Sequence, residues 1–449
     1  MLRRMLDPTQ ARDLLAESLP AFNGNHKFVL SGISVLDVAV RDAWIVQYSV
    51  EIRDADTQAT HRHLLMAQHF PGGGLEKAAK RIRRQAHLLL ERRPELAQLW
   101  AQRSDLKLLV FPFPIDAKME QLPLVTDPEA VCRRFQGSAA LEGLAKFEHC
   151  LVKVLRYLPG KRCQILYVLR SDPAQRVAVL GKTFRDGRGL ALFGSMQKVA
   201  ALFARNGDPD LAAPRPLDYL PDWKMVLQEE APGITLHEIL RRGGMRSRHL
   251  VSAARTVAIL HNSSLGLTNC HRITDEIRLV EWSHRRLAAA GFWEGGFPPL
   301  LEKITGFGAN LRPSSLVPVH RDFYDKQLLI DEERTTLIDL DTLAFGYAEI
   351  DIANFIAHLH LRALQYRGVK ALKWQDLFLA SYVSHARQPP DPRRLKFFLA
   401  AAYFRLARKY RLRPKGKTIA TQLLRRARAL FHPNGETREL AITEGGVLA

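Results

Sequence analysis

The chain has few cysteines, and their spacing excludes two classes of protein. Cys132, Cys150, Cys163 and Cys270 are scattered through 449 residues, and no two form a Cys-x-x-Cys pair. Small zinc domains and disulfide-stapled secreted domains use closely spaced cysteines. The sequence therefore predicts neither, and it fits a reducing compartment.

Long apolar runs are also missing. No segment approaches the roughly 20 apolar residues that a membrane-spanning helix needs. The first residues, MLRRMLDPTQARDLL, lack the apolar core of a signal peptide. We therefore expect no membrane span and a cytoplasmic protein.

Acidic residues are scarce. The sequence has 66 Lys and Arg against 46 Asp and Glu, a net charge of +20. Such a surface attracts nucleotides, phosphorylated metabolites, nucleic acid or acidic membranes. A merely solvated basic surface explains the same charge. The length suits two or three domains, and 47% hydrophobic residues is normal for a globular protein.

The first half of the chain repeats one order of elements. Two strand-like runs, 43–52 and 63–70, precede a Pro-Gly-Gly-Gly break and a basic amphipathic helix over 75–93. The same order returns in strands over 162–170 and 176–184, a glycine turn at 186–189 and a helix over 190–205. Aligning LLMAQHF (64–70) with AVLGKTF (178–184) sets Gln68 against Lys182. The pattern predicts a degenerate internal repeat; the alternative is two unrelated hairpins, each followed by a helix.

The remainder predicts an α+β protein with a hinge between a β-rich and a helical part. Residues 104–136 look like a connector that ends in a short helix, and a strand-rich insert spans 316–345. We expect an N-terminal α/β region over 1–140, a β-rich lobe over 141–231 and a helical lobe over 232–449. Helices are predicted over 8–20, 236–242, 247–265, 275–291, 296–305, 350–366, 372–386, 392–411 and 416–432.

The strongest motif is Val319-His-Arg-Asp-Phe-Tyr-Asp-Lys-Gln-Leu-Leu-Ile330, followed by Thr336-Leu-Ile-Asp-Leu-Asp341. Two short apolar strands joined by a polar turn would bring Asp322, Gln327 and Asp339 to one mouth of a hairpin. Three oxygen-bearing side chains there suit a hard cation such as Mg²⁺ with its phosphates. An ordinary hairpin with surface carboxylates is the alternative.

This stretch resembles the aminoglycoside phosphotransferase and choline kinase-like family, relatives of the protein kinases. The resemblance implies a two-lobed protein-kinase-like fold. It also implies transfer of the γ-phosphate of ATP to a hydroxyl of a small molecule, with Mg²⁺ as cofactor.

The resemblance implies roles for the motif's residues. Asp322 matches the catalytic Asp that orients the acceptor hydroxyl and takes its proton, and Asp339 matches the metal-binding Asp. His320 matches the histidine that holds the loop. Gln327 stands where the family mostly has a metal-binding Asn, and it offers the same amide oxygen one methylene further out.

Lys182 stands alone among apolar residues, in the place of the family's phosphate-binding lysine. The segment 155–162 matches the phosphate-covering loop, where Gly160 lets the backbone approach anions. A solvent-facing strand lysine is the alternative. Kinases pair this lysine with a helix Glu, but residues 190–206 contain no Asp or Glu. Gln197, Asp186 or the nucleotide alone would then hold Lys182.

The segment Lys224-Met-Val-Leu-Gln-Glu-Glu-Ala-Pro-Gly233 resembles the interlobe hinge of the family. The resemblance implies that the Glu229 carbonyl and the Ala231 amide meet adenine. Any strand-to-helix turn would look the same.

Several further residues have simpler readings. Asp341 is a second metal ligand or an exposed turn carboxylate. Asp351 is expected to cap a helix and His261 to pack in the core. The basic stretch 405–428 is expected to be a solvated helical face rather than a nucleic-acid site.

Three functions follow from these patterns. The first is an active small-molecule kinase. The second is a catalytically weak or inactive nucleotide-binding regulator, and the third is a nucleic-acid-associated kinase-like protein. The acid-poor, Arg-rich C-terminal lobe fits a polycationic aminoglycoside poorly, so a neutral or anionic acceptor fits at least as well. Residues 1–140 fit a degenerate lobe repeat, a dimerisation element or a lid.

Overall fold

The computed structural model describes residues 1–22, 28–90, 94–136, 138, 141, 147–172, 175–292, 297–413 and 416–432. It divides into two compact units. One comprises Met1–Leu190, Leu217–Gln228 and Leu412–Pro414, and the other comprises Ala191–Pro216, Glu229–Arg411 and Lys415–Ala449.

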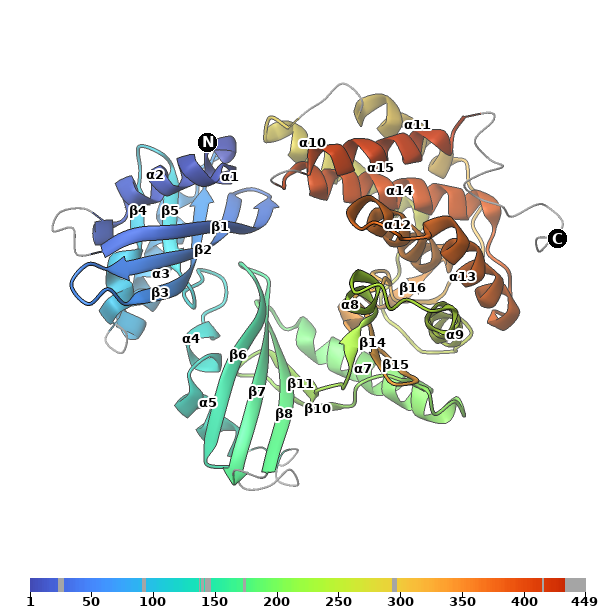
Figure 1. Ribbon diagram of the computed structural model, residues 1–449, viewed down its shortest axis with the longest axis horizontal. Coiled ribbons are helices and arrows are strands. Elements are labelled where there is room, and N and C mark those ends of the chain that lie inside the picture. Colours follow the sequence, from blue (N-terminus) through green and yellow to red (C-terminus); the bar gives the residue numbers. More distant parts are fainter. Residues whose placement is uncertain are drawn as a thin grey trace. The chain divides into compact units, whose positions relative to one another are not determined.

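The first unit begins with a five-stranded antiparallel sheet in the order β1-β2-β3-β5-β4 (Figure 1). Fully buried Leu14 and Leu15 anchor the preceding helix, and the Tyr48 hydroxyl donates to the Met5 carbonyl at 2.6 Å. The elements are α1 (Leu2–Leu6), α2 (Pro8–Ser18), η1 (Pro20–Phe22), β1 (Phe28–Val40), β2 (Trp44–Asp54), β3 (Thr60–His69), α3 (Leu75–Leu90), η2 (Pro94–Leu99), β4 (Ala101–Arg103) and β5 (Leu108–Pro112).

One expectation for this region was wrong in part, and one strand was not foreseen. The segment 104–136 was expected to be a connector, but β5 lies between β3 and β4 and all five of its residues are buried. An apolar run that short, ended by Pro112, lacks the alternation that marks a strand. The strand β1 was not expected, because its mixed sequence leaves most of its side chains partly exposed.

A second five-stranded sheet follows, in the order β10-β11-β8-β7-β6. Counted along the chain, this is the order of the first sheet, 1-2-3-5-4, and in both sheets a helix follows the third strand. The elements are α4 (Leu122–Val125), α5 (Pro128–Gln136), β6 (His149–Leu158), β7 (Arg162–Asp172), β8 (Gln175–Phe184), α7 (Arg188–Arg205), β9 (Leu211–Ala212), β10 (Pro216–Leu220) and β11 (Met225–Glu229).

The two sheets also share an unusual backbone turn. Lys107 and Lys224 both adopt positive φ, 50° and 46°, which is uncommon for a residue with a Cβ. The carbonyl of Lys107 accepts from the Phe70 amide at 2.9 Å, and that of Lys224 accepts from the Phe184 amide at 3.1 Å. Phe70 and Phe184 are the last residues of the two aligned heptapeptides.

The residue before each of these phenylalanines also makes a matching side-chain contact. The ring Nδ1 of His69 lies 3.0 Å from the Leu106 carbonyl, and the Thr183 hydroxyl donates to the Trp223 carbonyl at 2.7 Å. Leu106 and Trp223 each directly precede the positive-φ lysine. The sheets therefore match in strand order, in one strained turn and in one side-chain contact.

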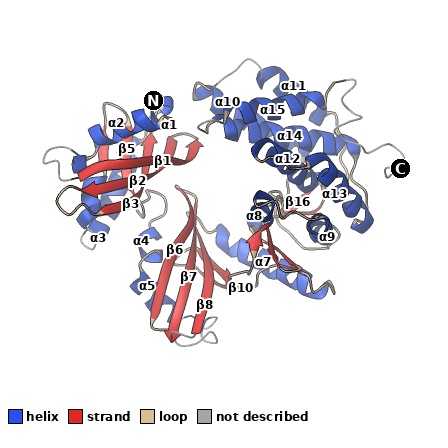
Figure 2. Ribbon diagram, viewed as in Figure 1, coloured by secondary structure: helices blue, strands red, loops and turns tan. Residues whose placement is uncertain are grey.

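The second unit is mostly helical (Figure 2). The helix α12 is buried from Glu349 to Arg362, and α14 packs against it. The predicted helices match these elements to within a few residues. They are α8 (Leu236–Arg241), α9 (Ser247–His261), α10 (Ile273–Ala289), α11 (Phe297–Ala309), α12 (Glu349–Gln365), α13 (Ala371–His385), α14 (Pro392–Arg411) and α15 (Lys417–Ala429). None of the described helices is long and apolar enough to cross a membrane.

The predicted strand-rich insert forms two small sheets, β12-β14-β15-β9 and β13-β16. Gly233 lies against the hairpin with φ of 98°, and a Cβ there would lie 2.3 Å from the Ile330 carbonyl oxygen. Only glycine fits so close an approach. The strands are β12 (Ile234–Thr235), β13 (Val317–Val319), β14 (Leu328–Asp331), β15 (Arg334–Leu337) and β16 (Ala344–Gly346), with η3 (Leu340–Thr342) between the last two. The α+β fold class is confirmed.

Candidate active site

The loop from His320 to Gln327 joins β13 to β14. The buried imidazole ring of His320 helps to hold it. His320 has no exposed surface. Its Nε2 donates to the Ile338 carbonyl at 2.9 Å, and its Nδ1 accepts from the Asp322 amide at 3.3 Å. The neutral tautomer with the proton on Nε2 satisfies both contacts. His320 thus ties the loop to the strand that leads into Asp339.

Asp351 does not cap its helix, so this expectation was wrong. No side chain caps α12 at its N-cap Ala348. The fully buried carboxylate of Asp351 instead accepts from the His320 amide at 2.7 Å and the Arg321 amide at 2.6 Å. Arg321 has φ of 68°, and these bonds hold that unfavourable backbone in place.

His261 is buried, as expected, and it also supports the loop. Its Nε2 lies 3.0 Å from the Asp351 carboxylate, and its Nδ1 lies 2.8 Å from the Tyr382 hydroxyl. His261 on α9 therefore supports the loop indirectly, through Asp351.

The hairpin brings Asp322, Gln327 and Asp339 together. The Ile338 amide donates to the Gln327 carbonyl at 2.9 Å, which extends the β14–β15 ladder to the residue before Asp339. Gln327 Nε2 donates to Asp322 Oδ2 at 3.2 Å. Burial raises the pKa of Asp322, and the nearby charge of Asp339 raises it further. Asp339 itself has φ of 62°, a strained conformation for a residue with a Cβ.

This oxygen-rich set fits a hard divalent cation. Two carboxylates that repel each other are stabilised when a cation lies between them, and amide and phosphate oxygens suit Mg²⁺. Among the described residues, no three or more His, Cys, Asp or Glu side chains gather in a group able to hold a metal. Nucleotide phosphates would have to complete the coordination.

Lys182 lies on β8 in the first unit, with 6% of its surface exposed, so it is not the solvent-facing strand lysine. Asp186 is engaged elsewhere, because Arg188 Nε donates to its Oδ1 at 2.7 Å and Arg185 Nε to its Oδ2 at 3.3 Å. Gln197 has an exposed side chain on α7, a helix that contains no acidic residue.

The predicted phosphate-covering turn joins β6 to β7. Gly160 has φ of 62°, and its amide donates to Asp116 Oδ2 at 2.6 Å. The Tyr157 hydroxyl donates to the same oxygen at 2.5 Å. The Gly160 amide is therefore occupied by a buried carboxylate, and phosphate contact at this residue stays a prediction.

The next residue of this turn lies in a strongly positive field. Burial and, to a smaller extent, the charges of Arg41, Arg162, Arg188 and Arg185 together lower the pKa of Lys161 to about 8. Neighbouring cations repel one another, and this repulsion helps to lower the pKa of the lysine. A bound anion would stabilise the group. Arg41 belongs to the β1–β2 turn, so both sheets contribute to this field.

The predicted hinge begins in β11, and its residues Glu229 and Ala231 belong to the second unit. The Glu229 amide donates to the Arg215 carbonyl at 3.0 Å, and the two side chains form an ion pair at 2.5 Å. Within the described residues no hydrogen bond occupies the Ala231 amide. Adenine recognition at Glu229 and Ala231 stays a prediction.

Residues 167–398, more than half of the chain, match the sequence model of the family described as "Phosphotransferase enzyme family". The chain belongs to this family. The match confirms the resemblance drawn from the His320–Asp341 motif. It leaves β6 and the whole N-terminal sheet outside its bounds.

Solved structures similar to this phosphotransferase include three kinases of low sequence identity. A choline/ethanolamine kinase family protein from Mesorhizobium loti is 13% identical, covers 70% of this chain and 97% of its own, and has a TM-score of 0.47. For a choline kinase from Cryptosporidium parvum these values are 12%, 70%, 97% and 0.48. For a glucosamine kinase they are 15%, 94%, 98% and 0.41. No curated protein matches the chain.

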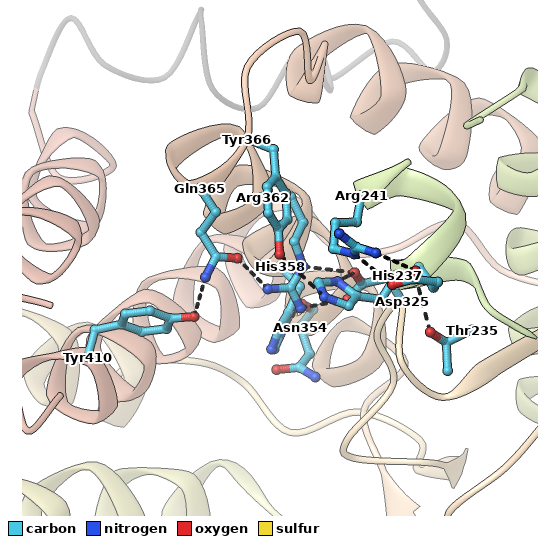
Figure 3. A network of polar contacts seen from close by, with 11 residues as sticks. Thr235, His237, Arg241, Asp325, Asn354, His358, Arg362, Gln365, Tyr366 and Tyr410 are labelled. Atoms are coloured by element: carbon cyan, nitrogen blue, oxygen red, sulfur yellow. Dashed lines mark hydrogen bonds and ion pairs between the residues drawn. The ribbon is translucent and has the colours of Figure 1, made fainter. Parts of the chain in front are cut away.

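Asp325 anchors the loop of this phosphotransferase, and sequence reasoning missed it. Its side chain is buried and accepts from His237 Nδ1 at 2.8 Å and from Arg362 Nε and Nη2 at 2.8 and 3.0 Å (Figure 3). Its carbonyl accepts from the His237 amide at 3.0 Å. Burial alone would raise the pKa of Asp325, but these bonds hold it well below its usual value.

The network continues away from the loop. Arg362 Nη1 donates to Gln365 Oε1 at 2.6 Å, and Gln365 Nε2 donates to the Tyr410 hydroxyl at 2.6 Å (Figure 3). The rings of Tyr324 and His358 stack with centroids 4.1 Å apart. Burial lowers the pKa of His358 to about 3, so this ring is neutral. The one indication of a role for Asp325 in the sequence was its position, three residues after Asp322.

Proposed function

We propose that this phosphotransferase moves the γ-phosphate of ATP to a hydroxyl group of a small molecule. One observation carries the proposal. In a chain of this family, Asp322 is fixed by His320 and Gln327 and lies close enough to Asp339 for the two charges to interact.

The proposed reaction is an in-line displacement. The acceptor oxygen bonds to the γ-phosphorus, the bond from that phosphorus to the bridging oxygen breaks, and ADP leaves with the electron pair. The hydroxyl proton passes to Asp322, which must be ionised to take it. Because burial and Asp339 raise the pKa of Asp322, activity should fall on acidification earlier than for an exposed carboxylate.

The other predicted residues have supporting roles in this proposal. Asp339 and Gln327 hold Mg²⁺, which neutralises charge on the β- and γ-phosphates when bound. Lys182 meets the phosphates as a point charge, and Gly160 lies in the turn that covers them. The Glu229 carbonyl and the Ala231 amide bind adenine.

An ATP-consumption screen over amino alcohols, sugars and aminoglycosides tests the proposal. We expect at least one acceptor to gain a phosphate, and Asp322→Asn to reduce that transfer about 1,000-fold, within the range for a general base. The variant should still bind ATP and unfold like the parent. Full transfer by Asp322→Asn would refute the assignment.

A catalytically weak nucleotide-binding regulator is the second candidate. The composition of α7 favours it, because kinases place a glutamate on this helix and α7 contains no Asp or Glu. ATP binding without transfer to any acceptor in the screen would favour the regulator. Measurable transfer that Asp322→Asn abolishes would exclude it.

We also propose that residues 1–140 form a degenerate copy of the β-rich lobe at 141–231, followed by the helical lobe at 232–449. The shared strand order and the matching turns at Lys107 and Lys224 support this division. Residues 139–140, at the first boundary, lie outside the described residues.

A further inference from the structure

A short linking segment, residues 116–121, leads from β5 of the first sheet to α4, within the first unit. Asp116 begins it with 3% of its surface exposed, and Gln121 ends it with 7%. Buried polar side chains such as these need hydrogen-bond partners in the fold. The segment precedes the family match, which begins at residue 167. Its two buried side chains find their partners in the second sheet.

The carboxylate of Asp116 holds the turn between β6 and β7. Its Oδ2 accepts from the Gly160 amide at 2.6 Å and from the Tyr157 hydroxyl at 2.5 Å, and its Oδ1 accepts from the Lys118 amide at 2.7 Å. A Cβ at Gly160 would lie 3.3 Å from Lys118 Cδ, so the Lys118 side chain also lies against the turn. A buried carboxylate that satisfies three donors fixes the groups that carry them. The conformation of the turn therefore depends on Asp116.

The side chain of Gln121 holds the end of β8. Its Nε2 donates to the Thr183 hydroxyl oxygen at 2.8 Å and to the Phe184 carbonyl at 2.7 Å. Thr183 directly follows Lys182 in the chain. Gln121 thus fixes the strand next to the lysine that we propose meets the phosphates.

The turn and the end of β8 are also bonded to each other. The Arg185 amide donates to the Lys161 carbonyl at 3.0 Å. Lys161 follows Gly160 in the turn, and Lys182 precedes Thr183 in β8. A charge-assisted bond to a phosphate is strong only when the cation is held at the right distance and angle. The linking segment therefore supports the turn and the strand that the proposed function places beside the phosphates.

The same segment is bonded to the first sheet. The Asp116 amide donates to Gln85 Oε1 of α3 at 3.1 Å. The Phe113 amide, three residues earlier, donates to the Leu64 carbonyl of β3 at 2.8 Å, and the Phe113 ring lies with its centroid 4.9 Å from that of Tyr157. The first sheet is therefore connected, through this segment, to the turn between β6 and β7.

We infer that Asp116 and Gln121 are positioning residues of the nucleotide site, which hold the turn and the end of β8 where they can bind the phosphates. The inference rests on the proposed function, and it gives the region before the family match a role in nucleotide binding. Neither side chain touches the nucleotide. Because the proposed adenine contacts at Glu229 and Ala231 belong to another part of the chain, loss of this support should weaken binding of the phosphates alone.

Calorimetric titrations of the full chain with MgATP and with adenosine test the inference. Adenosine lacks phosphates, so the ratio of the two affinities isolates phosphate binding. We expect Asp116→Ala and Gln121→Met each to weaken MgATP binding about 10-fold and to leave adenosine binding unchanged. Asp116→Asn keeps one acceptor oxygen, so it should lose less, and it provides the same comparison if Asp116→Ala unfolds.

A matched control comes from the same segment. Glu120→Gln removes a carboxylate from its exposed surface and should change neither affinity. Urea unfolding of every variant measures stability separately. A purely structural role would lower stability and weaken MgATP and adenosine binding together, and that result would overturn the inference.

The outcomes separate the inference from the kinase assignment. MgATP binding that is unchanged in Asp116→Ala and Gln121→Met would overturn the inference and leave the assignment intact. MgATP binding that depends on both residues, without transfer to any acceptor, would uphold the inference and refute the assignment. A parent chain that binds MgATP no more tightly than adenosine would overturn the inference, whether or not an acceptor gains a phosphate.

Discussion

The two sheets of the first unit have the same strand order and differ at one telling position. Where β3 carries Gln68, β8 carries Lys182 in the aligned heptapeptides. The family match begins within β7, so it includes the strand with the lysine and excludes the strand with the glutamine. A sheet can therefore keep its topology with or without the lysine that we propose meets the nucleotide phosphates.

The contacts that the two sheets share are mainly backbone hydrogen bonds. The carbonyls of Lys107 and Lys224 each accept from the phenylalanine that ends the aligned strand segment. Backbone contacts tolerate side-chain change, whereas a phosphate site needs a particular charge. The first sheet thus shares the backbone architecture of the second, and the proposed phosphate contact belongs to the second sheet alone.

The largest expected effect comes from replacing Lys182 with glutamine, the residue at the matched position of the first sheet. Lys182→Gln should lower kcat/KM about 100-fold, the typical loss when one charge-stabilising donor is removed. Gln68→Ala, the matched change in the first sheet, should leave kcat/KM unchanged. Steady-state kinetics with the best acceptor measures both. Equal losses in the two variants would break the comparison.

The shared side-chain contact predicts the next effect. Thr183→Val should cost about 1–3 kcal/mol of unfolding free energy, because it leaves the buried Trp223 carbonyl without this donor and removes a partner of Gln121. His69→Phe, in the partly exposed equivalent, should cost less. Urea unfolding of both variants gives the two values, and a larger loss for His69→Phe would contradict the account.

A pH effect should follow from the turn between β6 and β7. Lys161 has a pKa lowered to about 8, so in the free protein it is charged below that pH and neutral above it. If this turn meets phosphates, ATP affinity should fall as pH rises through about 8, by up to about tenfold per pH unit for one proton. Lys161→Arg stays charged and should give a flat profile. A wild-type profile that is also flat would remove this turn from the phosphate site.

The smallest effect tests the shared turn. Lys107→Gly and Lys224→Gly should each stabilise the protein by up to about 1 kcal/mol, because glycine adopts positive φ without strain but loses more chain entropy. Thermal unfolding measures the shift. Opposite signs at the two positions would show that the turns are not equivalent.

The sequence predicted the helices of the second unit and the hairpin of the His320–Asp341 motif, because apolar periodicity and a compact motif are local signals. It missed β5, whose short apolar run is buried on every side, and β1, whose pattern is mixed. The support given by Asp325 and Asp351 was also missed. Their partners Arg362 and His320 lie 37 and 31 residues away, and no local pattern encodes such pairs.

A calorimetric titration with Mg²⁺ and ATP tests the central claim most directly. The account predicts a single binding event per chain, lost in Lys182→Ala and unchanged in Gln68→Ala. Two binding events, or one that survives Lys182→Ala and disappears in Gln68→Ala, would contradict it.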